Sequence, residues 1–94
     1  MRGLFVPIIL RKGVNRMGAV DERMDARAAG DYRRAFELDL VILNRKGSKR
    51  LMQLEIEECL NDLEALGLLH LLPENFDQFS VYGQRDILNK VTLP

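Results

Sequence analysis

The sequence has little of several features that would narrow its class. It contains one cysteine, Cys59, and one histidine, His70, so it offers no intramolecular disulfide and no cysteine–histidine set with zinc spacing. This scarcity favours a reducing, cytoplasmic compartment. The longest early apolar run, residues 4–10, is interrupted by Pro7 and is far too short to span a membrane. With 14 basic and 14 acidic residues, the chain also lacks the net charge of a polybasic membrane or nucleic-acid binder.

What the sequence contains is typical of one ordinary globular domain. Its 94 residues leave room for a single domain, 1–94, and 47% apolar with 30% charged residues excludes collagen-like and disordered chains. The charge is unevenly spread, because residues 1–20 hold four bases and no acid, whereas residues 21–64 hold 8 bases and 11 acids. The basic start is compatible with an organelle transit peptide or with a solvated basic face, and we favour the second.

Two helices are predicted from their capping and apolar spacing. The first covers residues 21–29, with Asp21 as N-cap and Gly30 as the left-handed residue after its end. Its apolar stripe is predicted at i, i+4 and i+8, namely Val20, Met24 and Ala28. The second covers residues 59–69, with Gly67 and Pro73 marking its end. The segment 4–12 fits a helix or a strand.

Two patterns compete between residues 34 and 58. A helical stripe runs through Met52, Ile56, Cys59, Leu63 and Leu66. As strands, residues 36–42 and 52–56 alternate apolar with polar, and residues 44–48 have the form of a three-residue hairpin loop closed by Gly47. Pairing Asn44 with Ser48 sets three apolar pairs on one face, and a slip of one residue would spoil both faces. These pairs are Phe36 with Ile56, Leu38 with Leu54, and Leu40 with Met52. We therefore favour the hairpin, and predict two further short strands at 79–82 and 91–93.

The predicted hairpin gathers carboxylates on its polar face. Glu37, Asp39, Glu55 and Glu57 would lie on adjacent strands, with opposed side chains about 5 Å apart. Carboxylates at that distance repel one another, so a bound cation must neutralise them, some of them must take up a proton, or their side chains must turn into water. Carboxylate oxygens suit Mg²⁺ or Mn²⁺, and such an ion can activate water for attack on a phosphoryl group. A solvated acidic face with no ion is the alternative.

The same segment resembles a known nuclease superfamily. The string ELDLVIL (37–43), a turn and LMQLEIE (51–57) are similar to the core hairpin of the PD-(D/E)xK nucleases. The following NDLEALGLL (61–69), SVYG (80–83) and VTLP (91–94) resemble the nuclease-like domain at the C-terminus of prokaryotic AAA-type ATPases. The resemblance covers residues 32–94. It implies an α/β fold with a small mixed β-sheet and flanking helices, as in restriction endonucleases.

The resemblance also implies roles for particular residues. Asp39 and Glu55 would be the catalytic metal ligands, with Glu37 as a neighbouring ligand. Glu57 stands where the family has lysine, so it would serve as a second ligand or base. Without that lysine the usual partner of the attacking water or scissile phosphate is missing, which suits a degenerate docking module as well as an active enzyme.

A winged-helix regulator is a third interpretation. The segment 60–69 would be the last helix of its helix-turn-helix, and Val81 and residues 91–93 would form the wing. Two features count against it: about twenty residues between Gly47 and Gly67 are too few for two helices and a turn, and the helix carries acids where a groove-binding helix needs bases. The isolated His70 is expected to be structural, and Cys59 to be a small buried apolar residue.

The sequence therefore predicts a small metal-dependent nuclease-like domain acting on nucleic acid, with Mg²⁺ or Mn²⁺ as cofactor. The alternative is a catalytically inactive nuclease-fold module that binds a protein or nucleic acid, and a homodimer is compatible with either. No membrane association is expected. The phosphate contacts are predicted to come from two basic stretches, Arg11, Lys12 and Arg16, and Arg45, Lys46, Lys49 and Arg50.

Overall fold

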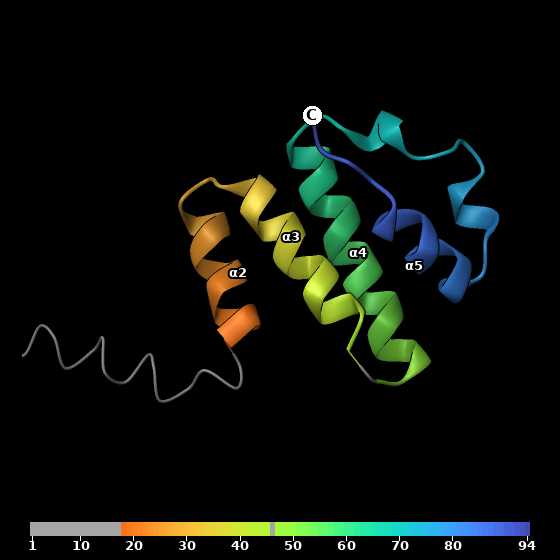
Figure 1. Ribbon diagram of the computed structural model, residues 1–94, viewed down its shortest axis with the longest axis horizontal. Coiled ribbons are helices and arrows are strands. Elements are labelled where there is room, and N and C mark those ends of the chain that lie inside the picture. The colour runs from red at the N-terminus through yellow and green to blue at the C-terminus, as the bar shows by residue number, and fades with distance from the viewer. Residues whose placement is uncertain (1–17, 46) are drawn as a thin grey trace, which may run out of the picture.

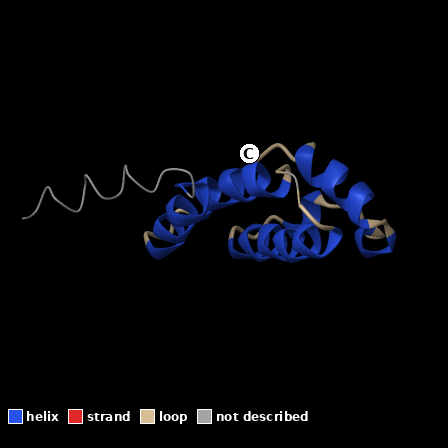
Figure 2. Cartoon of the chain, turned by 90° about the horizontal axis from the view of Figure 1, so that it is seen from below, coloured by secondary structure: helices blue, strands red, loops and turns tan. Residues whose placement is uncertain are grey.

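The computed structural model describes residues 18–45 and 47–94, and every regular element within them is helical. In chain order these are α2 (Gly18–Ala28), α3 (Tyr32–Leu43), α4 (Lys49–Ala65), the 3₁₀ turns η2 (Leu69–Leu71) and η3 (Phe76–Gln78), and α5 (Val81–Asn89). Figure 2, coloured by secondary structure, contains helices and loops and no strand in the described part. The predicted α/β fold with a mixed β-sheet is therefore wrong.

The segment predicted as a hairpin forms two helices joined by a short loop. Residues 36–42 belong to α3 and residues 52–56 to α4, so neither is a strand. Ser48, expected in the hairpin loop, is the N-cap of α4 and accepts a hydrogen bond from the Leu51 amide at 3.1 Å. Asn44, its expected hairpin partner, is the C-cap of α3. The turn residues thus end one helix and begin the next.

The two predicted C-terminal strands are also wrong. Residues 79–82 include the start of α5, where Ser80 is the N-cap and accepts a hydrogen bond from the Gly83 amide at 3.1 Å. Residues 91–93 have no regular structure. Without these segments as strands, the wing of the winged-helix interpretation is absent from the described residues.

The helix ends marked by glycine are confirmed. Gly30 and Gly67 adopt positive φ angles of 77° and 72°. After Gly67, the Leu68 amide donates to the Leu63 carbonyl at 2.8 Å, which is the long hydrogen bond of a Schellman motif. The predicted helix at 59–69 exists, but it begins ten residues earlier, at Lys49, and ends at Ala65.

Three helices follow one another in space as they do in the chain. α2 packs against α3 and α3 against α4, while α5 packs across α4 and α3 (Figure 1). The apolar core lies among α3, α4, η3 and α5. Its buried residues are Phe36, Leu43, Met52, Ile56, Cys59, Leu63, Phe76, Val81 and Leu88. The α4 members follow the helical stripe of the sequence, so the helical pattern is the one that the fold uses.

The loop between α3 and α4 fixes which ends of the helices meet. The N-terminal end of α2, the C-terminal end of α3 and the N-terminal end of α4 lie together at one end of the described chain (Figure 1). No described helix combines the length and apolar character needed to cross a membrane.

Candidate functional site

The four carboxylates of the predicted metal site do not share a face. Glu37 is exposed on α3, where its carboxylate lies 3.4 Å from the Arg34 guanidinium. Glu57 is exposed on α4. Asp39 and Glu55, by contrast, point to the side of the bundle that α2 covers, and both contact Arg23. The expected set of Asp39, Glu55 and Glu37 as metal ligands is therefore not assembled.

Arg23 joins three helices. It projects from α2, only 8% of its surface is exposed, and its Nη1 donates to Asp39 Oδ1 of α3 at 3.0 Å. The same nitrogen donates to Glu55 of α4, and Nη2 donates to the second Glu55 oxygen at 3.4 Å. Arginine suits this position because its planar group presents several donors in a fixed fork.

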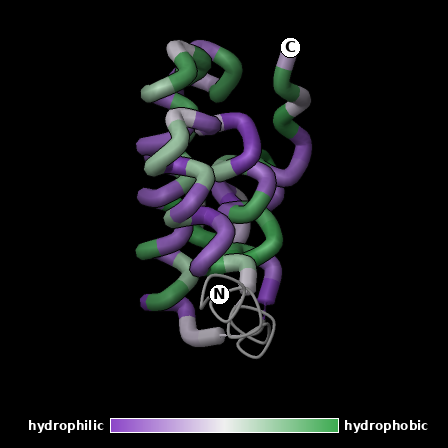
Figure 3. Tube along the Cα trace, turned by 90° about the vertical axis from the view of Figure 1, so that its left-hand side faces the viewer, coloured by the Kyte–Doolittle hydropathy of each residue, from purple (hydrophilic) through white to green (hydrophobic). Residues whose placement is uncertain are grey.

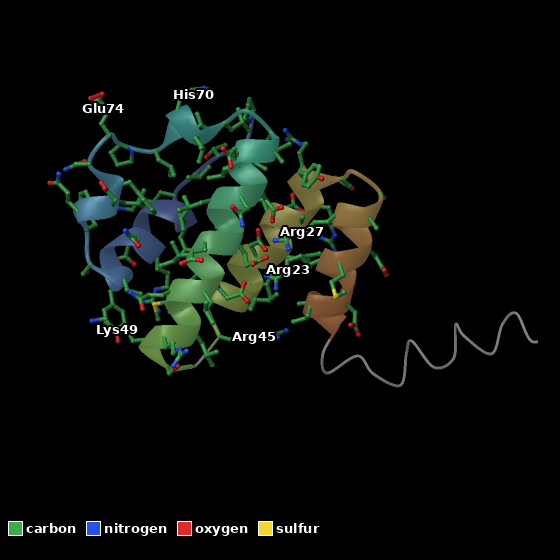
Figure 4. The ribbon with its side chains drawn as sticks, turned by 180° about the vertical axis from the view of Figure 1, so that it is seen from behind. Arg23, Arg27, Arg45, Lys49, His70 and Glu74 are labelled. Atoms are coloured by element: carbon green, nitrogen blue, oxygen red, sulfur yellow. The ribbon has the colours of Figure 1, made fainter. Side chains whose placement is uncertain are left out.

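Arg27, one helical turn further along α2, contacts three carboxylates. Its Nε and Nη2 donate to the two oxygens of Asp62 at 3.0 and 2.7 Å. Its Nη1 lies 2.6 Å from Glu58, and Nη2 lies 3.3 Å from Asp39 Oδ1. Figure 4 shows Arg27 above Arg23, both between α2 and the two helices beside it. We call these residues the ionic cluster: Arg23, Arg27, Asp39, Glu55, Glu58 and Asp62.

The ionic cluster holds four carboxylates against two guanidiniums. Asp39 is fully buried and Asp62 almost so, and Asp39 Oδ2 has no hydrogen-bond partner. Burial first, and then the adjacent Asp62 by hydrogen bonding and charge repulsion, raise the pKa of Asp39 to about 8 against the lowering effect of Arg23 and Arg27. A proton on Asp39 thus relieves both the surplus charge and the unpaired oxygen.

The pKa values of the two arginines are raised as well, which keeps the arginines charged. Burial lowers the pKa of Arg23, but its hydrogen bonds to Glu55 and Asp39 outweigh this and leave the pKa raised. The hydrogen bond to Asp62 raises the pKa of Arg27 well above its ordinary value. Both guanidiniums are therefore firmly charged, and they bind Asp39 Oδ1, both oxygens of Glu55 and both oxygens of Asp62. Within residues 18–45 and 47–94, no group of three or more acidic, cysteine or histidine side chains is placed to hold a metal.

The helix α2 meets its neighbours with charged side chains rather than apolar ones. The predicted apolar stripe is on the wrong face, since Met24 is 62% exposed and Ala28 is exposed. The buried face carries Ala19, Arg23 and Ala26. Two buried alanine side chains contribute on the order of 1–2 kcal/mol of hydrophobic stabilisation. Figure 3, seen from the α2 side, shows hydrophilic residues recurring along the nearest helices.

A second feature is a cavity where α3 ends and α4 begins. Its volume is about 260 Å³, and it opens to solvent between the two helix ends. Two of its leucines are half exposed, Leu51 at 58% and Leu54 at 51%. We call this the corner groove. Its apolar lining consists of Ile42, Leu43, Leu51, Met52 and Leu54.

Basic residues lie at the same end of the bundle as the corner groove. Arg45 lines the groove, and Lys49 and Arg50 are exposed in the first turn of α4. Figure 4 places Arg45 and Lys49 at this end. Three residues of this predicted basic stretch, Arg45, Lys49 and Arg50, are therefore exposed at one end of the bundle. The remaining predicted phosphate contacts, Arg11, Lys12, Arg16 and Lys46, lie outside the described residues, as does the segment 4–12.

The two remaining candidate residues show no contact that points to catalysis. His70 is exposed on η2, at the opposite end of α4 from the corner groove (Figure 4). Cys59 is fully buried in the core, and burial raises the pKa of its thiol, so the thiol stays protonated and unreactive. The prediction that Cys59 is a small buried apolar residue is confirmed.

Comparison with known proteins adds no relative. No family model, curated protein or solved structure matches the chain. The hairpin that carried the resemblance to the PD-(D/E)xK nucleases is absent from the described residues. The corner groove and the ionic cluster are therefore the two features of the described residues that bear on function.

Proposed function

We propose that the chain is a helical docking module whose corner groove binds an apolar segment of a partner protein, with acidic residues flanking that segment. The observation that carries the proposal is the pair of half-exposed leucines, Leu51 and Leu54, beside an open cavity at the end of α4. They are three residues apart, so they lie on one face of the helix.

The size of the cavity favours a side chain as its occupant. Pockets for small molecules and cofactors usually enclose about 300–1,000 Å³. At about 260 Å³ the corner groove is smaller, and an apolar anchor residue of a peptide fits its dimensions and lining. Helical and extended peptides commonly bind in this way, with anchors in a groove between helices.

The charges near the corner groove indicate which residues should lie beside the apolar anchor in the partner segment. Arg45, Lys49 and Arg50 are exposed at its end of the bundle. Glu55, the acid that lines the groove, is engaged by Arg23. Acidic residues beside the anchor would be attracted to the three bases, which raises the association rate and disfavours basic partners. The chain's own apolar segment 4–10 is flanked by bases and fits this rim less well.

A selection experiment tests the proposal. The immobilised full chain is offered a displayed library of random twelve-residue peptides. We expect enrichment of peptides that combine large apolar residues with aspartate or glutamate. Leu54→Glu should weaken their binding by at least about tenfold, because a charge enters the apolar lining. Raising NaCl to about 0.5 M should also weaken binding, since the rim contacts are exposed.

A matched variant separates the groove from general surface effects. Leu69→Glu makes the same change at a leucine that is 41% exposed on η2, at the far end of α4, and should leave peptide affinity unchanged. No enrichment, enrichment of basic peptides, or an equal loss in both variants contradicts the proposal. So does a dimer in sedimentation that Leu54→Glu converts to a monomer, because the groove would then join two copies.

A further inference from the structure

The attachment of α2 to the rest of the fold rests on the ionic cluster. None of the nine buried residues of the apolar core belongs to α2. Its buried surface consists of Ala19, Ala26 and Arg23, and its largest apolar side chain, Met24, faces solvent. Besides the small apolar contacts of its two buried alanines, the helix is held by Arg23 and Arg27, which reach four carboxylates on α3 and α4.

The surface beneath α2 is incompletely satisfied by α2. Its four carboxylates face only two guanidiniums, and Asp39, which has no exposed surface, leaves Oδ2 without a partner. Arg23 Nε is likewise buried without a partner. Native interiors seldom leave such atoms unpaired, and each one costs stability. Arg23 Nε and, while Asp39 is ionised, Asp39 Oδ2 are therefore polar atoms that remain unpaired when α2 occupies this surface.

We infer that the acidic face of α3 and α4, formed by Asp39, Glu55, Glu58 and Asp62, is a docking surface for an arginine-bearing helix, which α2 occupies in cis as a detachable strap. The partner in trans is a helix with two arginines one turn apart and small residues on the same face. This chemistry is that of α2 itself, whose Arg23, Ala26 and Arg27 already fill the surface. The three residues 29–31, with Gly30 in the left-handed region, form the hinge.

This surface borders the corner groove, because Glu55 belongs to both, but the two surfaces take partners of different chemistry. The groove takes an apolar segment with acidic flanks, whereas the acidic face takes bases. Opening of α2 leaves the apolar core of α3, α4 and α5 intact, because that core contains no residue of α2. Local opening of this kind is the usual behaviour of elements with few buried apolar contacts.

Amide hydrogen exchange of the full chain tests the strap. We expect α2 amides to be protected roughly 100-fold less than the α4 amides of residues 56–63, since they exchange through a smaller opening. Arg27→Gln removes charged hydrogen bonds and should lower α2 protection by at least about tenfold, with α4 protection unchanged. Arg85→Gln, the same change on α5 where Arg85 lies over the Tyr82 ring, should alter neither.

Addition of the helix in trans tests the docking surface. The full chain with Arg23→Gln and Arg27→Gln is titrated with a synthetic peptide of residues 18–30, and the amide resonances of Glu58 and Asp62 are followed. Saturable shifts are expected with this peptide and not with one in which both arginines are glutamine. If the α4 amides of the double variant lose their protection, the titration is done on the single variant Arg27→Gln, which keeps Arg23.

Each outcome decides one part of the inference. Exchange of α2 in step with α4 means that α2 opens only when the whole domain unfolds, and this overturns the strap. If α2 exchanges faster than α4 but the peptide of residues 18–30 causes no resonance shifts, the proposal that the acidic face is a docking surface is overturned. Shifts with the arginine-free peptide show that the contact does not depend on charge, and they overturn it as well.

Discussion

Replacement of Phe36 by alanine is expected to lower the free energy of unfolding by about 3–5 kcal/mol. Phe36 lies on α3 with 1% of its surface exposed, in the core shared with α4 and α5. The substitution loses the transfer free energy of the ring and leaves a cavity that the surrounding helices cannot fully close. Small domains are stabilised by only about 5–15 kcal/mol. The substitution should therefore remove a large share of the stability of the domain and lower its melting temperature.

The matched control is the same change at Phe79. This ring is 42% exposed between η3 and α5, so Phe79→Ala should cost less than about 1 kcal/mol. Both values follow from urea unfolding monitored by far-ultraviolet circular dichroism. Equal losses in the two variants, or a loss confined to Phe79→Ala, would show that the core does not lie among α3, α4 and α5.

Replacement of Asp39 by asparagine is expected to remove a pH dependence of stability. The pKa of Asp39 is raised in the folded chain to about 8, from an unfolded value of 3.8, by burial and by Asp62. The charged groups around it are Arg23 and Arg27 from α2 and Glu55, Glu58 and Asp62 from α4. Asparagine keeps the size of the side chain, lacks the charge and can donate a hydrogen bond towards Asp62.

The sign follows from the raised pKa. The folded chain holds a proton on Asp39 that the unfolded chain releases above about pH 4, so the stability due to this group is complete below that pH. It is lost as the pH rises from about 4 to about 8, at no more than about 1.4 kcal/mol per pH unit. Relative to wild type, Asp39→Asn should therefore become progressively more stable across this range and keep a constant advantage above it.

Urea unfolding at a series of pH values measures this difference. Asp86→Asn, the same substitution at an exposed residue of α5, should follow the wild-type curve. If Asp39→Asn is instead less stable than wild type at pH 8 and above, the carboxylate of Asp39 is stabilised by its arginines more than it is penalised by burial, and the account of its proton is wrong.

The sequence allowed part of the fold to be predicted from local signals. Gly30 was recognised as the left-handed residue after a helix and Gly67 as a mark of a helix end, and both adopt positive φ angles. The stripe of Met52, Ile56, Cys59 and Leu63 was identified as one of two possible patterns, and the structure confirms it. These features depend on neighbours within one or two helical turns, and a sequence displays such neighbours directly.

The choice between helix and hairpin could not be made locally. In a short segment, apolar residues at every second position also supply residues four apart. Phe36 and Leu40 therefore fit both a strand face and a helix stripe. Asn44 and Ser48 suit a hairpin loop, and they also suit a C-cap and an N-cap. The decision comes from packing of α3 and α4 against α5, which lies some thirty residues further along the chain.

The ionic cluster was missed for a related reason. Arg23 and Asp39 are 16 residues apart, and Arg27 and Asp62 are 35 apart, so no local spacing reveals the pairs. Charged residues are normally placed on the exposed face of a helix, which led to the wrong apolar stripe for α2. The spacing of Ala19, Arg23 and Ala26 on one face was the available signal, since small residues indicate close approach of a neighbouring helix.

The ionic cluster, which ties α2 to α3 and α4 in place of a metal ion, is tested most directly by titration of the Asp39 carboxyl carbon. Nuclear magnetic resonance of the ¹³C-labelled full chain gives its pKa with EDTA and with Mg²⁺. We predict titration near pH 8 in both solutions, because burial and Asp62 set the pKa and two arginines already bind Asp39 Oδ1. A pKa below the ordinary aspartate value that falls further with Mg²⁺ would contradict this and return Asp39 to the role of a metal ligand.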